Sequence, residues 1–480
     1  MKLKTTQQRY REYLDTLPLS TLRILGRQEG VGQASSNNKD ALIESIIDLL
    51  TGKAQPAPRS NRGAPVKQTF LDPSVRERLE EIRRQGSEDG RQIRNILEVA
   101  SGRERDPFDS PVYTGILEIT RGGYGFIRAR GSRIGIADDV FVPAPMIHAL
   151  SLREGDFVAC TAKSQQADEP AEFGELLSVN GLAVGKYERR PDFDSLGAVY
   201  PEEKIVLSQG NQDISLRVID LFAPLGKGQR ALIAAPPSSG KTRLLKSIAN
   251  AIYRDHPELV LMIFLVDERP EEVTELIGSV RNAQVVFTTF DRSAEEHVRE
   301  AHLVIEHAKR LAEHGKDVVV LVDSLTRLAR AYNSLQEYSG KALSATLDAR
   351  ALTETKRFFC AARNTQGAGS ITMLATILTG TESAFDEAVC EGFRGTENMD
   401  IVLSRALCER RVYPAIDLCR SGTRRELLTD DERSALCRMR ESGVSGNTEE
   451  VLEMMRRTAD NQEFIARLPE LLRVRKGSKD

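Results

Sequence analysis

The stretch Ala235-Pro-Pro-Ser-Ser-Gly-Lys-Thr242 limits the possible folds of this chain more than any other feature. It follows an apolar run at 231–234 and precedes a helical pattern at 242–253. A turn of this kind between a strand and a helix directs backbone N–H groups toward phosphate oxygens. The stretch therefore predicts a nucleoside triphosphate site, with Lys241 at the β- and γ-phosphates and Thr242 as a ligand of Mg²⁺. The first position is Ala235 instead of glycine, so a strand, turn and helix that carry Gly-Lys-Thr by chance stay an alternative.

Two acidic residues follow other apolar runs, and each has two interpretations. Asp323 ends the run 318–322, where it either holds the Mg²⁺ of a phosphate-loop ATPase or caps the next helix. Glu268 follows the run 259–266, and a carboxylate at that edge of a sheet can orient and deprotonate a water molecule. The alternative for Glu268 is a solvated acidic helix start.

The order of apolar runs predicts an α/β fold class. After residue 206, strand-like runs alternate with helical stretches, which predicts a parallel sheet with helices on both faces. Between 112 and 179, five shorter runs with glycine-rich turns predict a small closed β-barrel of the OB type. The strands of the larger sheet are expected at 231–235, 259–266, 285–289, 318–322, 371–377 and 400–403.

These patterns divide the chain into five segments. The apolar residues of 7–50 recur at helical spacing, although so short a segment holds only a marginal core. We expect a helical unit at 1–51, a charged, proline-containing linker with a helical insert from Pro73 to about Arg84 at 52–111, the barrel at 112–190, the ATPase-type domain at 191–430 and a charged helical tail at 431–480.

The composition excludes a molecule-wide attraction to nucleic acid or membrane. The 480 residues include 67 Lys and Arg against 70 Asp and Glu, so any site for a polyanion must be local. The charged start lacks the apolar core of a signal peptide, and the longest apolar run, 259–266, is too short to cross a bilayer. The six cysteines form no Cys-x-x-Cys pair, which predicts buried thiols in a reducing, cytoplasmic compartment.

Several strings of this sequence resemble the family of bacterial transcription termination factor Rho. The similarity covers roughly residues 112–430 and, more weakly, 7–50. It implies a homohexameric, RecA-like, RNA-dependent ATPase that moves 5′ to 3′ on nascent single-stranded RNA, has helicase activity and releases RNA from RNA polymerase. The matching strings are Gly226–Arg230, the double-proline phosphate loop, Val266–Glu275, Asp323–Asn333, Lys356–Phe359, Arg411–Asp417 and Ser421–Arg424.

The resemblance implies a set of residues at the nucleotide. Glu268 becomes the residue that activates water, and Tyr413 the aromatic ring that stacks on adenine. Arg424 matches an arginine finger supplied by the neighbouring subunit, a device that contributes on the order of 10³ to 10⁵ in rate; without the family it is an ordinary surface arginine. The other expected contacts to ATP are Gly226, Lys227, Gly228, Gln229, Arg230, Ala231, Ser238, Ser239, Gly240, Lys241, Thr242, Arg243 and Arg269, and the expected metal ligands are Thr242 and Asp323.

A second set of residues is expected to bind RNA. Tyr124 and Phe126 match an aromatic platform for stacked bases, preferably pyrimidines, whereas by themselves two alternating aromatic residues would be barrel core. The segment 112–186 has seven basic and nine acidic residues, so stacking must contribute more to RNA affinity than phosphate contacts do. The expected set is Gly123, Tyr124, Gly125, Phe126, Ile127, Arg128, Asp139, Val140, Phe141, Ala171, Glu172 and Phe173 in the barrel, with Lys341 and Ala384 on two loops of a central pore.

The chain departs from the family pattern at several of these positions. Ala384 stands where an RNA-contacting lysine is usual, and Ala345-Thr346 replace paired glycines. These changes favour a rival function, a Rho-like RNA-binding ATPase with impaired translocation that acts as a regulator. A second rival, a RecA-like or rotary-ATPase-like subunit without RNA function, is opposed by the Tyr124 and Phe126 pair. The further departures are Ser238 for a lysine of the phosphate loop, Glu397 for a glycine and Glu172 for an arginine of the barrel cleft.

Overall fold

The chain forms two compact units, 1–109 and 110–480. Lys341, the pair Ala345-Thr346 and nearly all of the expected insert 73–84 lie outside the described residues. The computed structural model describes residues 6–29, 31, 38–50, 75, 112–128, 139–163, 170–187, 190–209, 213–281, 283–336, 347–425, 427–444 and 446–477.

The first unit is helical, as its sequence spacing predicts. Pro18 directly precedes α2, where its fixed φ suits a helix start, and the Asn38 side chain caps α3 by accepting a hydrogen bond of 2.9 Å from the Ala41 amide. Leu14, Leu22 and Leu25 form part of a small, fully buried core. The helices are α1 (Thr6–Thr16), α2 (Leu19–Glu29) and α3 (Lys39–Leu50).

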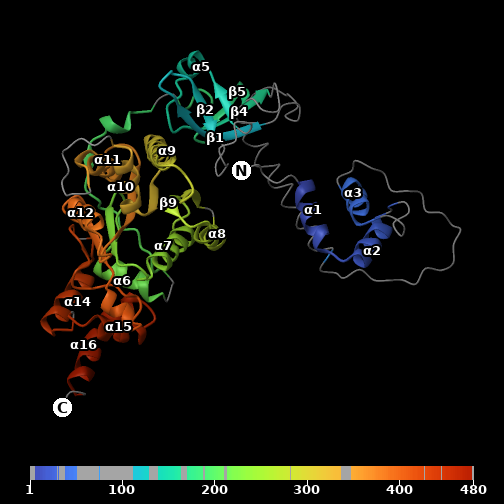
Figure 1. The fold of residues 1–480 in the computed structure, drawn as a ribbon. Helices are drawn as coiled ribbons and strands as arrows, with labels where there is room; N and C mark the ends of the chain where they lie inside the picture. The colour runs from blue at the N-terminus through green and yellow to red at the C-terminus, as the bar shows by residue number, and fades with distance from the viewer. Residues whose placement is uncertain are drawn as a thin grey trace. The chain divides into compact units, whose positions relative to one another are not determined.

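The second unit begins with the expected closed barrel (Figure 1). Its strands follow the order β3-β2-β1-β4-β5-β6, and a parallel pairing of β3 with β5 closes the cylinder. Leu117, Ile127 and Val158 point inward to the core. The elements are β1 (Val112–Ile119), β2 (Gly125–Arg128), β3 (Val140–Val142), α5 (Ala144–Ala149), β4 (Phe157–Lys163), β5 (Ala171–Val179) and β6 (Leu182–Ala183).

A larger sheet follows, and its strands match the apolar runs of the sequence. The order β10-β9-β11-β13-β8-β14 is parallel throughout. Short antiparallel strands that the sequence does not announce, β7 (Ala198–Val199), β12 (Arg363–Thr365) and β15 (Gly422–Thr423), extend it. The parallel strands are β8 (Arg230–Ala235), β9 (Val260–Glu268), β10 (Gln284–Thr289), β11 (Val318–Asp323), β13 (Ser370–Leu378) and β14 (Met399–Val402).

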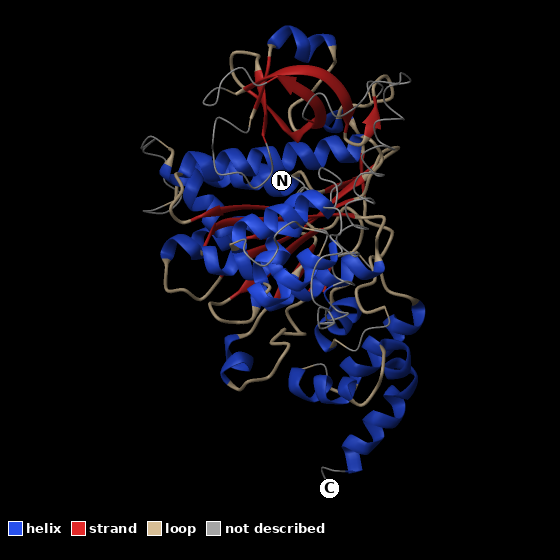
Figure 2. Cartoon of the chain, turned by 90° about the vertical axis from the view of Figure 1, so that its right-hand side faces the viewer, coloured by secondary structure: helices blue, strands red, loops and turns tan. Residues whose placement is uncertain are grey.

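Helices cover both faces of this sheet, so its strands are buried on two sides (Figure 2). On β9, Leu261 and Ile263 pack into one core while Met262 and Phe264 pack into the other. One face carries α6 (Ile214–Phe222), α7 (Lys241–Asp255) and α8 (Pro270–Ser279), and the other α9 (Ala294–Glu313), α10 (Leu325–Ser334), α11 (Ala349–Cys360) and α12 (Ala384–Phe393). The α/β fold class with a barrel and a helical N-terminal unit is thus confirmed, whereas the five segment boundaries stay a prediction.

The helices beyond residue 430 are part of the sheet domain's core. Met439 and Phe464 belong to the same buried cluster as the α7 side chains. The fully buried Arg217 of α6 donates hydrogen bonds to the carbonyl oxygens of Met455 and Thr458. The expected tail is therefore an integral layer, made of α14 (Asp430–Glu441), α15 (Thr448–Arg456) and α16 (Asn461–Gly477).

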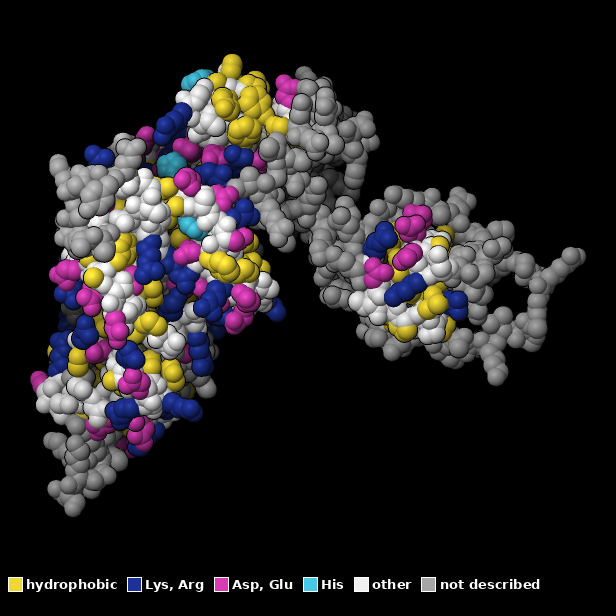
Figure 3. Space-filling view, in the orientation of Figure 1, with side chains coloured by type: hydrophobic (Ala, Val, Ile, Leu, Met, Phe, Trp, Pro, Cys, Tyr) yellow, Lys and Arg dark blue, Asp and Glu magenta, His cyan; other side chains and the backbone are white. Residues whose placement is uncertain are grey.

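The composition led to expectations about surface charge and about the burial of the cysteines. Lys, Arg, Asp and Glu side chains are interspersed on the second unit in Figure 3, consistent with the near balance of charge. The expectation of buried thiols is wrong for most cysteines: Cys160 is buried, but Cys360, Cys419 and Cys437 are exposed. Among the described helices, none has the length and apolar character needed to traverse a bilayer.

Candidate functional site

The loop between β8 and α7 has the conformation that a phosphate cradle requires. Ser238 and Gly240 have φ values of 59° and 87°, in the left-handed region, and α7 begins at the next residue, Lys241. Glycine adopts this conformation without strain, whereas Ser238 adopts it at a cost that proteins usually meet only at functional sites. The loop therefore turns sharply and aims the N-terminus of α7 outward from the sheet edge.

Lys241 and Asp323 meet above the carboxyl ends of the strands. Lys241 Nζ lies 2.6 and 2.7 Å from the two carboxylate oxygens of Asp323. Asp323 is only 2% exposed, and the Thr376 hydroxyl on β13 donates to its Oδ1 at 2.8 Å. The Ser324 hydroxyl caps α10 by accepting from the Arg327 amide, so the cap interpretation of Asp323 is wrong. Asp323 is instead a fixed carboxylate at the phosphate loop.

Glu268 ends the neighbouring strand β9 in a buried position. The residue is 3% exposed, and burial raises the pKa of its carboxyl to about 7, although the charges of Arg327 and Lys241 lower it. Oε1 accepts a long hydrogen bond of 3.4 Å from Arg327, while Oε2 has no partner in the described part of the chain. The first turn of α8 contains Glu271 and Glu272 instead, so Glu268 is not a solvated helix start. A buried carboxyl with a free oxygen and a pKa near neutrality suits a general base.

These residues fit a magnesium nucleotide. Among the described residues, no cluster of three or more His, Cys, Asp and Glu could hold a metal by itself, so an ion here would need phosphate oxygens beside Asp323 and Thr242. Thr242 is half-buried in the first turn of α7. Tyr413 lies beside the loop, since a β-carbon added to Gly240 would lie 3.9 Å from its ring, and the residue is 43% exposed. An aromatic face is therefore available next to the phosphate cradle.

The residues 226–231 lie at the other end of β8 from this cradle. Lys227 pairs with Glu203 and Asp317, and Gln229 is 1% exposed and donates to Asn398. Gly228 has a φ of 82°, and a β-carbon there would lie 2.2 Å from the Asn364 amide nitrogen. In the structure these residues fix the start of β8. Their contact with ATP stays a prediction, as do those of Ser239, Arg243 and the exposed Arg269 at the start of α8.

Arg424 is separate from its own chain's Lys241, Glu268 and Asp323. It follows β15, and the side chain is 55% exposed. Its Nη2 lies 2.8 Å from Glu397 Oε1, and its amide donates to the Asn398 carbonyl at 2.9 Å. No contact described for Arg424 involves the three charged residues at the phosphate loop. This placement is compatible with action on another subunit.

The barrel carries an aromatic cluster on β2, the turn before it and β3. The ring centroids of Tyr124, Phe126 and Phe141 lie 5.6 to 5.9 Å apart in edge and tilted arrangements. Tyr124 is 40% exposed, and the Arg128 guanidinium lies 4.8 Å from the Phe126 ring centroid. In Figure 3, hydrophobic side chains gather on the barrel. The core interpretation of these rings is therefore wrong for Tyr124, which is exposed.

The other expected barrel residues divide between surface and core. Phe173 is 8% exposed and packs with the barrel core instead of with the three rings. Arg128 is committed to two acids, Glu118 at 2.6 Å and Asp139. Exposed Glu172 pairs across strands with Phe141, whereas Ile127, Val140 and Ala171 are buried. Gly125 is buried and Gly123 adopts a φ of 80° in the preceding turn. The RNA contacts of all these residues stay a prediction.

Only part of the expected pore is described. Ala384 is exposed at the first position of α12, next to exposed Glu382, whose φ is 59°. The only acid of this turn that is neutralised in the described structure is Asp386, by Arg330 at 2.5 Å. Lys341 and Ala345-Thr346 lie outside the described residues.

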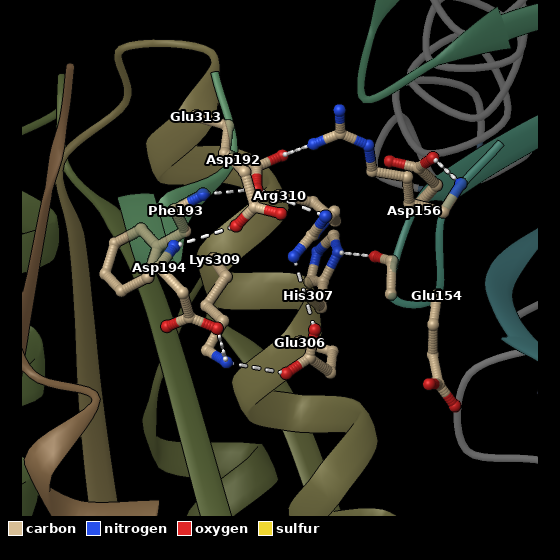
Figure 4. Close-up of polar contacts among 12 residues, drawn as sticks. Glu154, Asp156, Asp192, Phe193, Asp194, Glu306, His307, Lys309, Arg310 and Glu313 are labelled. Carbon is tan, nitrogen blue, oxygen red and sulfur yellow. Dashed lines mark hydrogen bonds and ion pairs between the residues drawn. The ribbon is translucent and has the colours of Figure 1, made fainter. Parts of the chain in front are cut away.

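A buried ionic network joins the barrel to α9 (Figure 4). Arg190 donates to both oxygens of Asp156, at 2.5 and 2.7 Å, and also lies 3.5 Å from Glu313. Burial raises the pKa of Glu313 although three arginines lower it. The sequence did not reveal this network, because its members are scattered from 153 to 314 and no motif marks them.

Gly155 allows the barrel to approach α9 this closely. Its carbonyl accepts a hydrogen bond of 2.8 Å from His307 Nδ1. A β-carbon on Gly155 would lie 2.4 Å from the Glu306 carbonyl carbon, so only glycine fits. The approach holds the barrel directly on the helix.

Comparisons with known proteins match both parts of the second unit. The nucleotide-binding domain of the ATP synthase alpha/beta family matches residues 215–423, and the Rho termination factor RNA-binding domain matches residues 113–184. Transcription termination factor Rho of Borreliella burgdorferi is 44% identical over 362 residues, covering 74% of this chain and 70% of that protein. The factor of the same name from Escherichia coli is 47% identical over 326 residues, covering 66% and 77%.

Solved structures of secretion ATPases also match. A prototypical ATPase from the type III secretion system of pathogenic bacteria is 21% identical, with a TM-score of 0.48, covering 58% of this chain and 88% of that one. The assembled ATPase EscN from enteropathogenic E. coli is 20% identical, with a TM-score of 0.47, covering 75% and 100%.

Proposed function

Because the chain belongs to the family of transcription termination factor Rho, we propose that it is an ATP-driven motor that binds nascent RNA and ends transcription at RNA polymerase. The observation that carries the proposal is the presence, in one compact unit, of a charged nucleotide site and an exposed aromatic platform. A rotary or secretion ATPase requires the first feature but not the second. The motor would act in the cytoplasm, where nascent RNA is made.

The chemistry proposed for the nucleotide site follows from three side chains. Glu268 accepts the proton of the attacking water at its unpartnered Oε2, since its pKa of about 7 leaves much of the carboxyl ionised at neutral pH. Lys241 exchanges Asp323 for phosphate oxygens. Asp323 is then free, together with Thr242, to hold Mg²⁺, which would neutralise charge on the transferred phosphoryl group.

Arg424 makes this chemistry depend on assembly. Its exposed guanidinium contacts no residue of its own phosphate loop, so we infer that it reaches the nucleotide of a neighbouring protomer. A ring of identical subunits, a homohexamer by family, supplies one such arginine to each site. Turnover is then a property of the ring and not of the protomer.

RNA binding is proposed to rest on stacking. Tyr124, Phe126 and Phe141 offer adjoining rings, and the nearest guanidinium, Arg128, is already paired with acids. Base stacking on such rings contributes about 1 to 3 kcal/mol per base by truncation. Single-stranded, pyrimidine-rich RNA is the expected ligand.

ATP turnover with and without oligo-C RNA tests the proposal. Wild type should be stimulated by RNA, and Glu268→Gln and Arg424→Ala should each lose turnover while still binding RNA. Mixing inactive Arg424→Ala with wild type should lower turnover more than dilution does, because each altered subunit disables its neighbour's site. Full-rate turnover by a monomer without RNA would refute the proposal.

One observation favours the regulator alternative. The turn before α12 presents exposed Ala384 and Glu382 and no described cation except the Arg330 already paired with Asp386. Weak binding of RNA by the pore loops would impair translocation while leaving ATP hydrolysis intact. Ala384→Lys should therefore raise RNA-stimulated turnover and strand unwinding, with Glu391→Lys at an exposed position of the same helix as control. Unchanged unwinding in Ala384→Lys would remove the support for this alternative.

A further inference from the structure

Glu397, which replaces a glycine usual in the family, lies against the proposed arginine finger. Its Oε1 is 2.8 Å from Arg424 Nη2. Glu397 is 6% exposed, whereas the Arg424 side chain is 55% exposed. A buried carboxylate thus holds an exposed guanidinium by one edge, and no other side-chain partner of Arg424 is described.

The backbone on both sides of Glu397 is held in place by hydrogen bonds. Arg230 donates to the Thr396 carbonyl at 3.0 Å, and Gln229 donates to the Asn398 carbonyl and side chain at 2.9 and 2.7 Å. These bonds tie both neighbours of Glu397 to the start of β8. The Arg424 side chain, in contrast, is long, flexible and 55% exposed, so its guanidinium is the more mobile partner of the pair.

Separation leaves an unfavourable arrangement behind. Glu397 Oε2 is already buried without a hydrogen-bond partner in the described structure. Without Arg424, both oxygens of a buried acid would lack partners, and breaking a buried pair in this way is costly. Burial first, and then the charge of Glu397, raise the pKa of nearby Asp400 to about 6, whereas Arg424 lowers it. Two acids therefore compete for one guanidinium.

We propose that Glu397 is a positioning residue that retains Arg424 on its own protomer, so that the arginine enters the neighbouring nucleotide site only when contacts there outweigh this pair. The inference rests on the proposed role of Arg424 in trans. The pair thereby lowers the rate of ATP hydrolysis in rings that have not bound RNA, an effect called the brake below. It gives this chain a control over basal turnover that a glycine at 397 could not provide.

The test measures kcat and KM for ATP with the full chain, with and without oligo-C RNA. Glu397→Gln and Glu397→Gly are made in wild type and in Arg424→Ala. In wild type both should raise the RNA-free kcat about five-fold, equivalent to about 1 kcal/mol, with KM unchanged. RNA stimulation should shrink by the same factor. In Arg424→Ala, the residual turnover should not respond to either change at 397.

Controls separate this proposal from the function on which it rests. Glu453→Gln removes an acid from an exposed pair with Arg457 and should leave turnover unchanged. Unchanged or lower RNA-free kcat in Glu397→Gln, with Arg424→Ala inactive, would overturn the brake alone. An increase that persists in Arg424→Ala would overturn it too. If Arg424→Ala turned over ATP like wild type, the trans role itself would fail, and the brake with it.

Discussion

The barrel platform and the sheet-edge site of this chain are built for opposite kinds of recognition. On the barrel, exposed Tyr124 lies beside the half-buried rings of Phe126 and Phe141, while Arg128 is paired with two acids. At the sheet edge, buried Asp323 and Glu268 surround Lys241. RNA affinity that depends on stacking varies little with base sequence or salt concentration. Catalysis that depends on buried charged groups is sensitive to the loss of a single polar atom. Changes of charge should therefore affect catalysis strongly and RNA affinity weakly.

The largest effect is expected from Lys241→Ala. Removing the cation that meets both Asp323 oxygens takes away phosphate binding and charge stabilisation together, so turnover should fall by on the order of 10³-fold or more. RNA binding, measured by filter retention, should be unchanged. Lys246→Ala, on the same helix and paired with Glu275, is the matched control. Loss of RNA binding in Lys241→Ala would contradict the claim that the barrel binds RNA independently of the nucleotide site.

Glu268→Gln should lower turnover by about 10²- to 10⁴-fold, because the amide cannot accept the proton of water. Only the ionised carboxylate acts as a base, and burial raises its pKa to about 7. In wild type kcat/KM should therefore reach half its plateau near pH 7 and fall about ten-fold per unit below that. The step should vanish in Glu268→Gln. A step that persists unchanged in Glu268→Gln would mean that another group is the base.

Tyr124→Ala should weaken oligo-C affinity by about ten-fold, the equivalent of about 1.4 kcal/mol within the range for one stacked base. RNA-free turnover should stay at the wild-type value, which fluorescence anisotropy and a phosphate-release assay would check together. Tyr253→Ala, with a similarly exposed ring on α7, is the control. Equal losses in both variants would show that the barrel rings are not the platform.

The smallest expected effect is the dependence of RNA affinity on salt concentration. If stacking dominates, the logarithm of RNA affinity should fall with the logarithm of salt concentration with a slope no steeper than about −2, that is, about three phosphate contacts. Arg128→Ala should change that slope little, because Glu118 and Asp139 already neutralise the guanidinium. A steep slope that Arg128→Ala relieves would show that the platform binds phosphate after all.

The sequence predicted those features whose signal is local. Apolar runs placed the parallel strands, and the position of Asp323 and Glu268 directly after two of them placed both acids at one sheet edge. Spacing could not reveal the Arg424–Glu397 pair, because the residues meet only through β14 and β15. Nor could alternation along a strand show that Phe173 faces the barrel core, since β4 and β5 pair with irregular register. The charged pattern of α14 to α16 likewise concealed the apolar stripe they bury.

The seat of the barrel on α9 has a mechanical consequence. Gly155 leaves no gap for a hinge, and the Arg190, Asp156 and Glu313 cluster clamps the same junction. Tension on a strand held by the barrel would pass without slack into a helix about 30 Å long that lies along the sheet. A load on the barrel would thus reach the strands that end at Glu268 and Asp323.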